Sequence, residues 1–215
     1  MNVRVAEDAD VVRSSRRTLD VQTTESGAET AIRYIPPRFV TSSVVDIIGH
    51  LGMALIWLTV GWFVYERRAA LGFVAIGLPF GLLPDTDLWL EKVFPTVHHH
   101  GITHTILFVT LASVVVGAAV GKWVVPKLEG KYVPQGEIGN EYAYAIGALW
   151  VGGLSHLFAD MLSAPDIASP IEPFWPLARS EVITMDLIWY NSTFWNWGFF
   201  LTGVALTLGF WWARR

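Results

Sequence analysis

Apolar residues in this sequence fall in runs of roughly twenty, the length that a helix needs to cross a bilayer. The chain has 215 residues, of which 53% are hydrophobic and only 16% are charged. Soluble domains carry about 25% charged residues, so the composition favours a membrane protein as well. We therefore expect an all-α, polytopic membrane protein.

The boundaries of these runs predict about five transmembrane helices. Charged residues at 66–68 close the first run, and Pro84 and Pro126 close the second and third. Tryptophans at both ends of the last run would form aromatic belts at the two membrane surfaces. The expected spans cover residues 41–65, 69–83, 103–125, 141–162 and 194–212.

The segment before the spans differs from them in composition. Residues 1–40 carry mixed charges and few large apolar residues at a helical period. We expect this tail to be mostly disordered, because it offers too little apolar surface to bury. Residues 41–215 are expected to form one membrane-embedded domain.

Charge and cysteine content exclude several kinds of site. The formal net charge is −4, which gives no basic surface for nucleic acid, so we expect no nucleic acid as primary partner. The chain has no cysteine, which excludes disulfides, thiolate metal ligands and cysteine nucleophiles. Any bound metal must therefore be held by His, Asp or Glu side chains.

Histidine and aspartate recur inside otherwise apolar segments, where ionisable residues are costly and indicate function. His156 and Asp160 are four residues apart, as are Asp46 and His50, so each pair lies on one face of a helix. Imidazole and carboxylate are ligands that zinc and similar divalent metals prefer. The alternative for a single pair is a His–Asp hydrogen bond within the membrane, but two such pairs favour a metal site.

Two carboxylates follow the proline that ends the second span. Asp85 and Asp87, on either side of Thr86, could bridge two metal ions or bind one. They need not both point to the same ion, because their positions alternate. The alternative is an ordinary polar loop that leaves the membrane.

The richest stretch has four histidines within seven residues, at 98, 99, 100 and 104. Packing does not explain such a cluster at the entrance of a span. We expect His99 and His104 to be metal ligands, with Gly101 allowing the chain to turn between them. His98 and His100 would contact substrate or solvent. A pH-sensing cluster at the membrane surface is the alternative.

The distribution of lysine and arginine predicts the orientation in the membrane. With five spans, the basic residues at 67–68, 122–131 and 214–215 fall on one side, which should be cytoplasmic. The candidate ligands then converge near the opposite face. We expect an integral inner-membrane protein with its site at the extracytoplasmic face, although an inverted orientation would also keep the ligands together.

In order and spacing, these motifs resemble a known family over residues 44–180. The segments that carry the resemblance are His50-Leu51-Gly52, Gly81 to Asp87, His99 to Thr105, Gly153 to Asp160, and Pro173-Phe174-Trp175-Pro176. They are similar to the YdjM-type family of membrane-bound, metal-dependent hydrolases, some of which are described as LexA-regulated. The family usually has arginine where this chain has His100. If that arginine grips an anionic substrate, His100 would do so more weakly and only when protonated.

The resemblance implies a hydrolase. The family is distantly similar to the zinc-dependent phospholipase C and single-strand nuclease group, which implies phosphoester hydrolysis. No serine stands in a nucleophile-elbow context, so metal-activated water is the expected nucleophile. A site at headgroup level, walled by Phe174 and Trp175, favours a lipid-like substrate such as a phospholipid.

The expected site holds one to three divalent ions, with zinc favoured and manganese the alternative. Asp87 is expected to be a ligand or a base and His100 to contact substrate, so these two are the expected catalytic residues. Two other functions would use the same ligands: a structural metal site in a membrane scaffold, and a metal transporter. The sequence leaves the oligomeric state open. The expected metal ligands are His50, Asp85, Asp87, His99, His104, His156 and Asp160.

Overall fold

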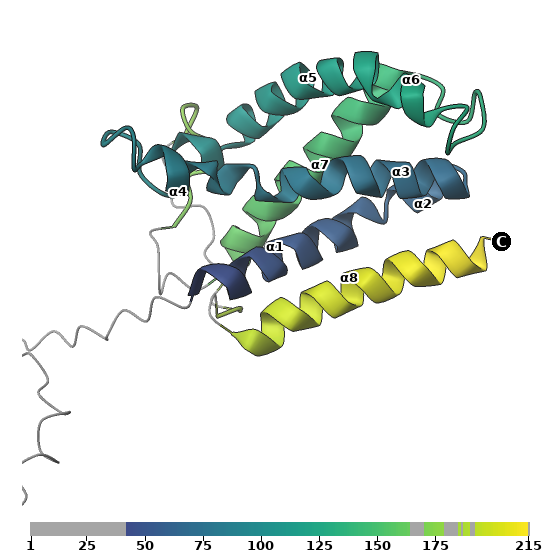
Figure 1. Cartoon of the computed structure of the whole chain (residues 1–215). Coiled ribbons are helices and arrows are strands. Elements are labelled where there is room, and N and C mark those ends of the chain that lie inside the picture. The colour runs from purple at the N-terminus through teal and green to yellow at the C-terminus, as the bar shows by residue number, and fades with distance from the viewer. Residues whose placement is uncertain (1–41, 164–169, 179–184, 186, 190–191, 215) are drawn as a thin grey trace, which may run out of the picture. The chain divides into compact units, whose positions relative to one another are not determined.

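The computed structural model describes residues 42–163, 170–178, 185, 187–189 and 192–214 (Figure 1). The predicted polar tail, residues 1–40, lies outside these described residues. Within the described part of the chain every regular element is helical, and the only β-type pairings are two isolated bridges. The predicted all-α fold is therefore confirmed.

The helices follow the apolar runs closely. Expected spans at 103–125 and 141–162 correspond to α5 and α7, and the first and second expected spans are each broken into shorter helices. The elements, in chain order, are α1 (Ser42–Leu58), α2 (Gly61–Val64), α3 (Arg67–Gly77), η1 (Leu78–Leu82), η2 (Pro84–Thr86), α4 (Asp87–Leu90), η3 (Ile102–His104), α5 (Ile106–Trp123), α6 (Val125–Leu128), α7 (Glu141–Leu162) and α8 (Thr193–Ala213).

Helix α7 crosses the middle of the bundle, with α5 on one side and α1 on the other, and α8 packs on α1 (Figure 1). Two glycines permit the closest approaches. A Cβ atom on Gly52 of α1 would lie 2.3 Å from the backbone nitrogen of Phe200 in α8, and one on Gly152 of α7 would lie 2.2 Å from the carbonyl oxygen of Gly77. A side chain at either position would force the helices apart.

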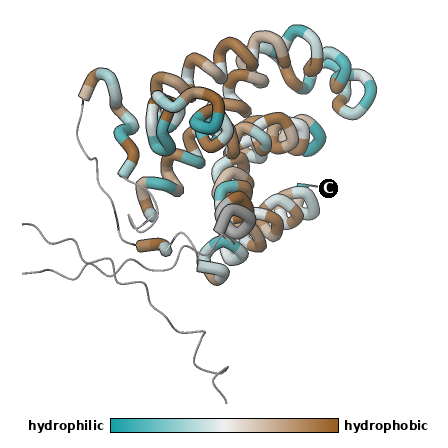
Figure 2. Tube along the Cα trace, turned by 60° about the vertical axis from the view of Figure 1, so that its left-hand side comes forward, coloured by the Kyte–Doolittle hydropathy of each residue, from teal (hydrophilic) through white to brown (hydrophobic). Residues whose placement is uncertain are grey.

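Three of the described helical segments are long and apolar enough to cross a membrane: Ile47–Val64, Ile106–Trp123 and Glu141–Leu162. A fourth arises if the bent pair Arg67–Leu82 and Pro84–Leu90 counts as one span. Apolar residues dominate these helices in Figure 2. Helix α8, the last expected span, is 21 residues long but is not among them. The count of five therefore stays a prediction.

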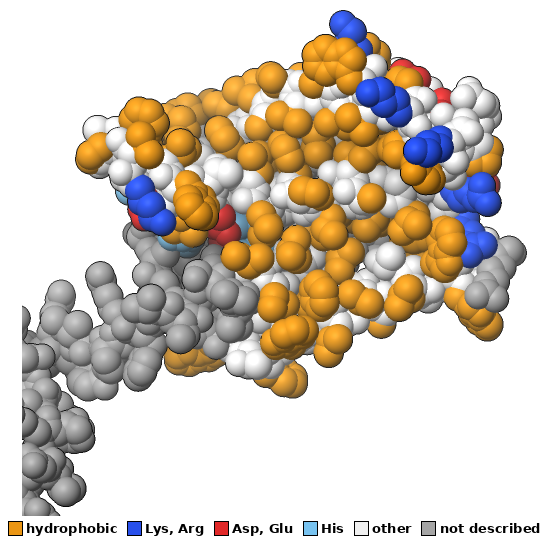
Figure 3. All heavy atoms as spheres, viewed as in Figure 1, with side chains coloured by type: hydrophobic (Ala, Val, Ile, Leu, Met, Phe, Trp, Pro, Cys, Tyr) orange, Lys and Arg blue, Asp and Glu red, His pale blue; other side chains and the backbone are white. Residues whose placement is uncertain are grey.

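The two ends of the bundle differ in charge. Lysine and arginine side chains gather at the end where α8 finishes, whereas histidine and acidic side chains appear near α4 (Figure 3). At the basic end the Arg67 guanidinium lies 3.6 Å from the ring centre of Trp211. The Arg214 side chain donates a hydrogen bond to the Tyr65 carbonyl at 3.2 Å. These contacts join the end of α8 to the start of α3 and to the residue Tyr65 that precedes it.

Candidate metal centre

The structure brings all seven sequence-predicted ligand residues together at the α4 end of the bundle. Segments far apart in the sequence supply them: α1, the bend from η2 into α4, the stretch that leads into η3, and the last turns of α7. All but one are buried, with exposed fractions of 9% or less, and His99 is half-buried. The residues are His50, Asp85, Asp87, His99, His104, His156 and Asp160.

A break in the second apolar run positions the two aspartates. Pro84 begins η2 with one residue between it and the end of η1, because proline cannot continue the preceding helical hydrogen bonds. The helical segments on either side of the break are bent by 41°. Asp85 and Asp87 are thereby turned into the cluster, and Asp87 is completely buried.

In the middle of the cluster, two imidazole nitrogens lie at nearly equal distances from each other and from two carboxylate oxygens. The Nε2 atoms of His104 and His156 are 3.3 Å apart. Asp85 Oδ1 is 3.6 Å from His104 Nε2 and 3.4 Å from His156 Nε2. Asp160 Oδ2 lies 3.6 Å and 3.3 Å from the same two nitrogens. An ion about 2.0–2.1 Å from four tetrahedral ligands holds them about 3.3–3.4 Å apart, so the four atoms could hold one such ion.

Hydrogen bonds behind the two imidazoles turn their lone pairs toward this point. His156 donates from Nδ1 to the Gly81 carbonyl at 2.8 Å, so its Nε2 is the basic nitrogen of the neutral ring. His104 Nδ1 lies 3.0 Å from Asp87 Oδ2 and donates to that carboxylate. The Nε2 lone pairs of His104 and His156 therefore face each other, and they repel unless a cation lies between them. The backing of a histidine ligand by a carboxylate or a carbonyl is typical of metal sites.

His50 joins the cluster from α1. Its ring stacks on that of His156 at 3.7 Å between centroids, and its Nε2 lies 3.5 Å from Asp160 Oδ1. Asp160 therefore directs one oxygen to the His104–His156 pair and the other to His50. These three residues, His50, His156 and Asp160, could hold an ion by themselves. The predicted partner of His50, Asp46, lies one turn earlier in α1, but its side chain lies outside the described part of the structure.

Asp87 connects the buried centre to its outer part. Its Oδ1 accepts a hydrogen bond from His99 Nδ1 at 3.0 Å, and its Oδ2 accepts from Thr103 Oγ1 at 2.8 Å as well as from His104. Both oxygens are therefore engaged by groups of the protein. Asp85, Asp87, His99 and His104 form a second set that could hold a metal ion.

The outer histidines adopt an unexpected turn. The residue in the left-handed region is His100, with φ of 63°, whereas the expected hinge, Gly101, has φ of −85°. Gly101 is needed for space instead, since a Cβ atom there would lie 2.7 Å from the His98 carbonyl oxygen. The turn places the His100 ring 4.2 Å from that of His99 and 4.7 Å from that of His104, measured between centroids. His98 is exposed.

The carboxylates govern the charge of His104, which precedes α5. Burial opposes protonation of this ring, but its hydrogen bonds with Asp85 and Asp87 and the nearby charge of Asp160 outweigh burial. The pKa of His104 is therefore raised above its ordinary value of 6.5. A cation at Nε2, whether a proton or a metal ion, is electrostatically favoured.

Two features of the site were not predicted from the sequence. The first is Thr103, whose hydroxyl donates a hydrogen bond to Asp87. Thr105 is the N-cap of α5, and its side chain accepts from the Phe108 amide at 3.1 Å. The second feature is a small pocket beside His50, between α1, α7 and α8, whose lining includes Ser163, Asn196 and Phe199. No local sequence signal places α8 next to His50.

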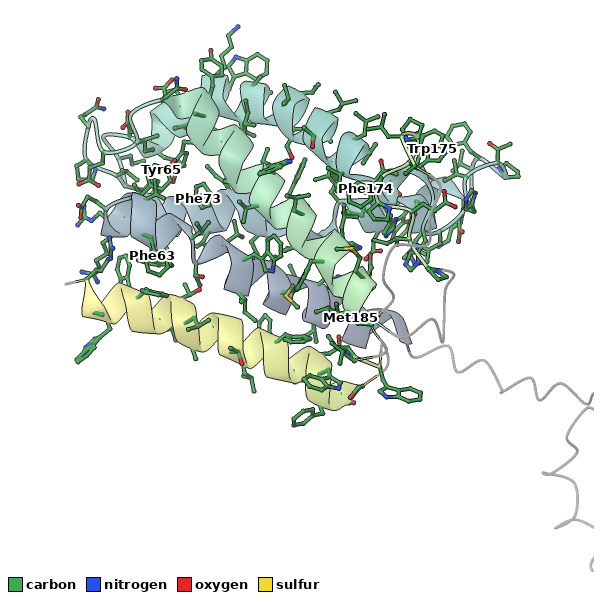
Figure 4. The ribbon with its side chains drawn as sticks, turned by 180° about the vertical axis from the view of Figure 1, so that it is seen from behind. Phe63, Tyr65, Phe73, Phe174, Trp175 and Met185 are labelled. Carbon is green, nitrogen blue, oxygen red and sulfur yellow. The ribbon has the colours of Figure 1, made fainter. Side chains whose placement is uncertain are left out.

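The segment expected to wall the site does lie at this end. Pro173 is buried and its carbonyl accepts from the Ile106 amide at 2.9 Å, at the start of α5. Phe174 and Trp175 follow, and Figure 4 shows both at the α4 end, opposite Tyr65. Phe174 is exposed and Trp175 is half-buried.

Comparison with protein families agrees with this architecture, whereas no curated protein and no solved structure matches the chain. The similarity to the phospholipase C and nuclease group therefore stays an expectation. One family model does match, over residues 45–215, and its description is YdjM inner membrane protein. That match includes all of the clustered histidines and aspartates and most of the chain, so the chain belongs to the YdjM inner membrane protein family.

Proposed function

We propose that this membrane protein is a metal-dependent hydrolase that acts on a phosphoester, with a lipid-like substrate favoured. The observation that carries the proposal is the convergence of two imidazole nitrogens and two carboxylate oxygens, with N–N and N–O separations of 3.3–3.6 Å. The proposal is also supported by the further side chains around these four, which a purely structural site would not require: His50, His99 and His100.

Zinc fits the donor set best. Two imidazoles with two carboxylates match the ligands of zinc, whereas magnesium and calcium prefer oxygen ligands alone. In this proposal His104, His156, Asp85 and Asp160 hold the ion. The second oxygen of Asp160, together with His50, offers donors for another ion. Manganese is the alternative metal.

When bound by three protein ligands, as the His50, His156 and Asp160 set allows, a metal ion would have an open position, would lower the pKa of a coordinated water to about 7 and would stabilise the charge that develops on a phosphate. The protein's own groups orient the site. Asp87 holds His99 and His104 by their Nδ1 atoms, so that Nε2 of His104 points inward. Since both Asp87 oxygens are already engaged, we favour a positioning role for it over the expected roles of ligand or base.

His100 is the best candidate to contact the substrate. It is half-buried, lies on the outer side of the cluster, and packs against His99 and His104. A protonated imidazole there would attract an anionic phosphate. The site lies at the ends of apolar spans, beside the exposed Phe174, and this position suits a substrate that is itself anchored in the bilayer.

A structural metal site is the second candidate function. Four protein donors around one ion would form a closed shell, which is typical of structural zinc. In that case removal of the metal would lower thermal stability, and no substrate would be turned over.

The first test is metal content by elemental mass spectrometry on detergent-purified protein. We expect at least one zinc per chain in the wild type, loss of zinc in His156→Ala, and retention in His98→Ala, which removes an exposed histidine outside the cluster. Metal-loaded protein is then offered phospholipids and soluble phosphate monoesters. Stoichiometric metal without hydrolysis of either class would favour the structural site, and absence of metal from folded protein would overturn both candidates.

A further inference from the structure

The segment that follows Asp87 exposes large apolar side chains at the end of the bundle that carries the cluster. Trp89 is 73% exposed, Val93 69% and Phe94 54%, and Ile102, at the start of η3, is 54% exposed. We call these four residues the apolar rim. Asp87, only two residues before Trp89, is completely buried. One short segment therefore supplies both the interior of the cluster and an apolar exterior.

The rim continues into a surface that lipid must cover. Ile102 leads directly into α5, a candidate span of which only 22% is buried. The exposed side chains of α5 begin with Leu107 and Leu111, which are 47% and 57% exposed. Figure 3 shows apolar side chains along the bundle and again around its α4 end, where basic, acidic and histidine side chains also appear. The apolar exterior of the span thus extends past the end of the helix.

The composition of the segment fits the boundary between lipid and water. Lys92 Nζ lies 4.7 Å from the ring centre of Trp89. Tryptophan and lysine both suit this boundary, because each has an apolar body and a polar or charged tip. Glu91 and Lys92 are exposed between the apolar residues, so the segment is amphipathic rather than uniformly apolar. A fully aqueous loop would gain nothing from exposing Trp89, Val93 and Phe94.

We propose that the apolar rim inserts into the headgroup region of the bilayer that the spans cross, with its side chains reaching the acyl-chain boundary. Helix α4 then lies at the membrane surface, and the Asp87 side of the cluster sits at headgroup depth. The partner of this surface is lipid, not a second copy of the chain or a soluble protein. The insertion does not require catalysis. Its consequence for substrate, that the phosphoester is presented by a lipid headgroup, rests on the proposed function.

The absence of cysteine makes the depth of the rim measurable. Single variants Val93→Cys and Phe94→Cys are spin-labelled in nanodiscs, and their collision rates with oxygen, which concentrates in lipid, are compared with those of a water-soluble nickel chelate. Leu111→Cys provides the lipid reference and Gln135→Cys, an exposed position in the loop between α6 and α7, the aqueous reference. Metal content and melting temperature must match the wild type for each labelled protein.

We expect the oxygen-to-nickel ratio at positions 93 and 94 to lie well above that at 135 and to approach that at 111. A ratio equal to that at 135 would overturn the proposal. So would protection from both reagents, since that result indicates cover by protein. A rim at lipid depth in a protein that hydrolyses no phosphoester would refute the proposed function and leave the insertion standing.

Discussion

His104 and His156 are 52 positions apart in the sequence, and their Nε2 atoms lie 3.3 Å apart in the fold. Neither ring can turn away, because Asp87 holds Nδ1 of one and the Gly81 carbonyl holds Nδ1 of the other. The pair could therefore share a cation. Substitution of the residues around this pair can therefore distinguish metal ligands from residues that only position the ligands.

Asp87→Asn should weaken zinc binding without abolishing it. The amide group of asparagine cannot accept from both His99 and His104, since its nitrogen would face an N–H donor. Loss of a carboxylate that backs a histidine ligand lowers metal affinity by about 10–100-fold. Competition with a chromophoric chelator measures the change. Complete loss of the metal, as large as that in His156→Ala, would show that Asp87 is itself a ligand.

Thr103→Val should lower zinc affinity by about tenfold through Asp87. Valine matches threonine in shape but removes the hydroxyl that donates to Asp87 Oδ2 at 2.8 Å. Thr103→Ser keeps the donor and should restore the affinity. The spectrum of the cobalt-substituted protein should shift in the valine variant alone. Wild-type affinity in the valine variant would show that the Thr103 hydroxyl does not act on the metal site.

Zinc loading should fall as the pH is lowered through the raised pKa of His104. Because Asp85 and Asp87 favour the charged ring, a proton competes with the metal at pH values above 6.5. The stability of the metal-free protein should change with pH in the opposite direction. Its stabilisation by protonated His104 is complete below 6.5 and disappears as the pH rises through the folded pKa. Equilibrium dialysis measures zinc loading, and thermal melts measure the stability of the metal-free protein across the pH range. If both quantities rose or fell together with pH, the prediction would be contradicted.

The sequence predicts this site better than it predicts the geometry within it. His156 and Asp160 are recognisable because a spacing of four on a helix fixes their common face. Pro84 is recognisable as the break that delivers Asp85 and Asp87. Whether Asp87 is a metal ligand or a positioning group depends instead on which side chains contact it in the fold. Those contacts come from residues distant in the sequence, so local spacing cannot predict them. The same holds for Thr103, whose partner lies 16 positions away.

The fold, too, has features that the sequence predicts and features that it does not. The apolar runs predict the bounds of α7 and place those of α5 within three residues, because each is one uninterrupted segment. The first expected span is broken between Leu58 and Gly61, where no proline stands, and the second changes to η1 at Leu78, next to Pro79. His100, not Gly101, takes the left-handed conformation, which composition alone would assign to glycine. Packing against His99 and His104 accounts for the difference.

Gly152→Ala should destabilise the bundle. The added methyl group would lie 2.2 Å from the Gly77 carbonyl oxygen, and such overpacking costs about 1–3 kcal/mol. Gly209→Ala in α8 is the matched control, because nothing lies within 4 Å of a Cβ atom there, and alanine favours a helix by about 0.5–1 kcal/mol. Thermal melts in detergent should therefore shift in opposite directions. A stable Gly152→Ala variant would show that α3 and α7 can separate without cost.

The orientation can be tested with single cysteines at the two ends of the bundle. Thr96 is exposed in the segment that follows α4, and Gln135 is exposed at the basic end. If the basic end faces the cytoplasm, a membrane-impermeant maleimide should label Thr96→Cys in intact cells and Gln135→Cys only after permeabilisation. The reverse pattern would place the metal centre at the cytoplasmic face. Any phosphoester substrate would then have to be presented by the inner leaflet, although the ligands would remain together.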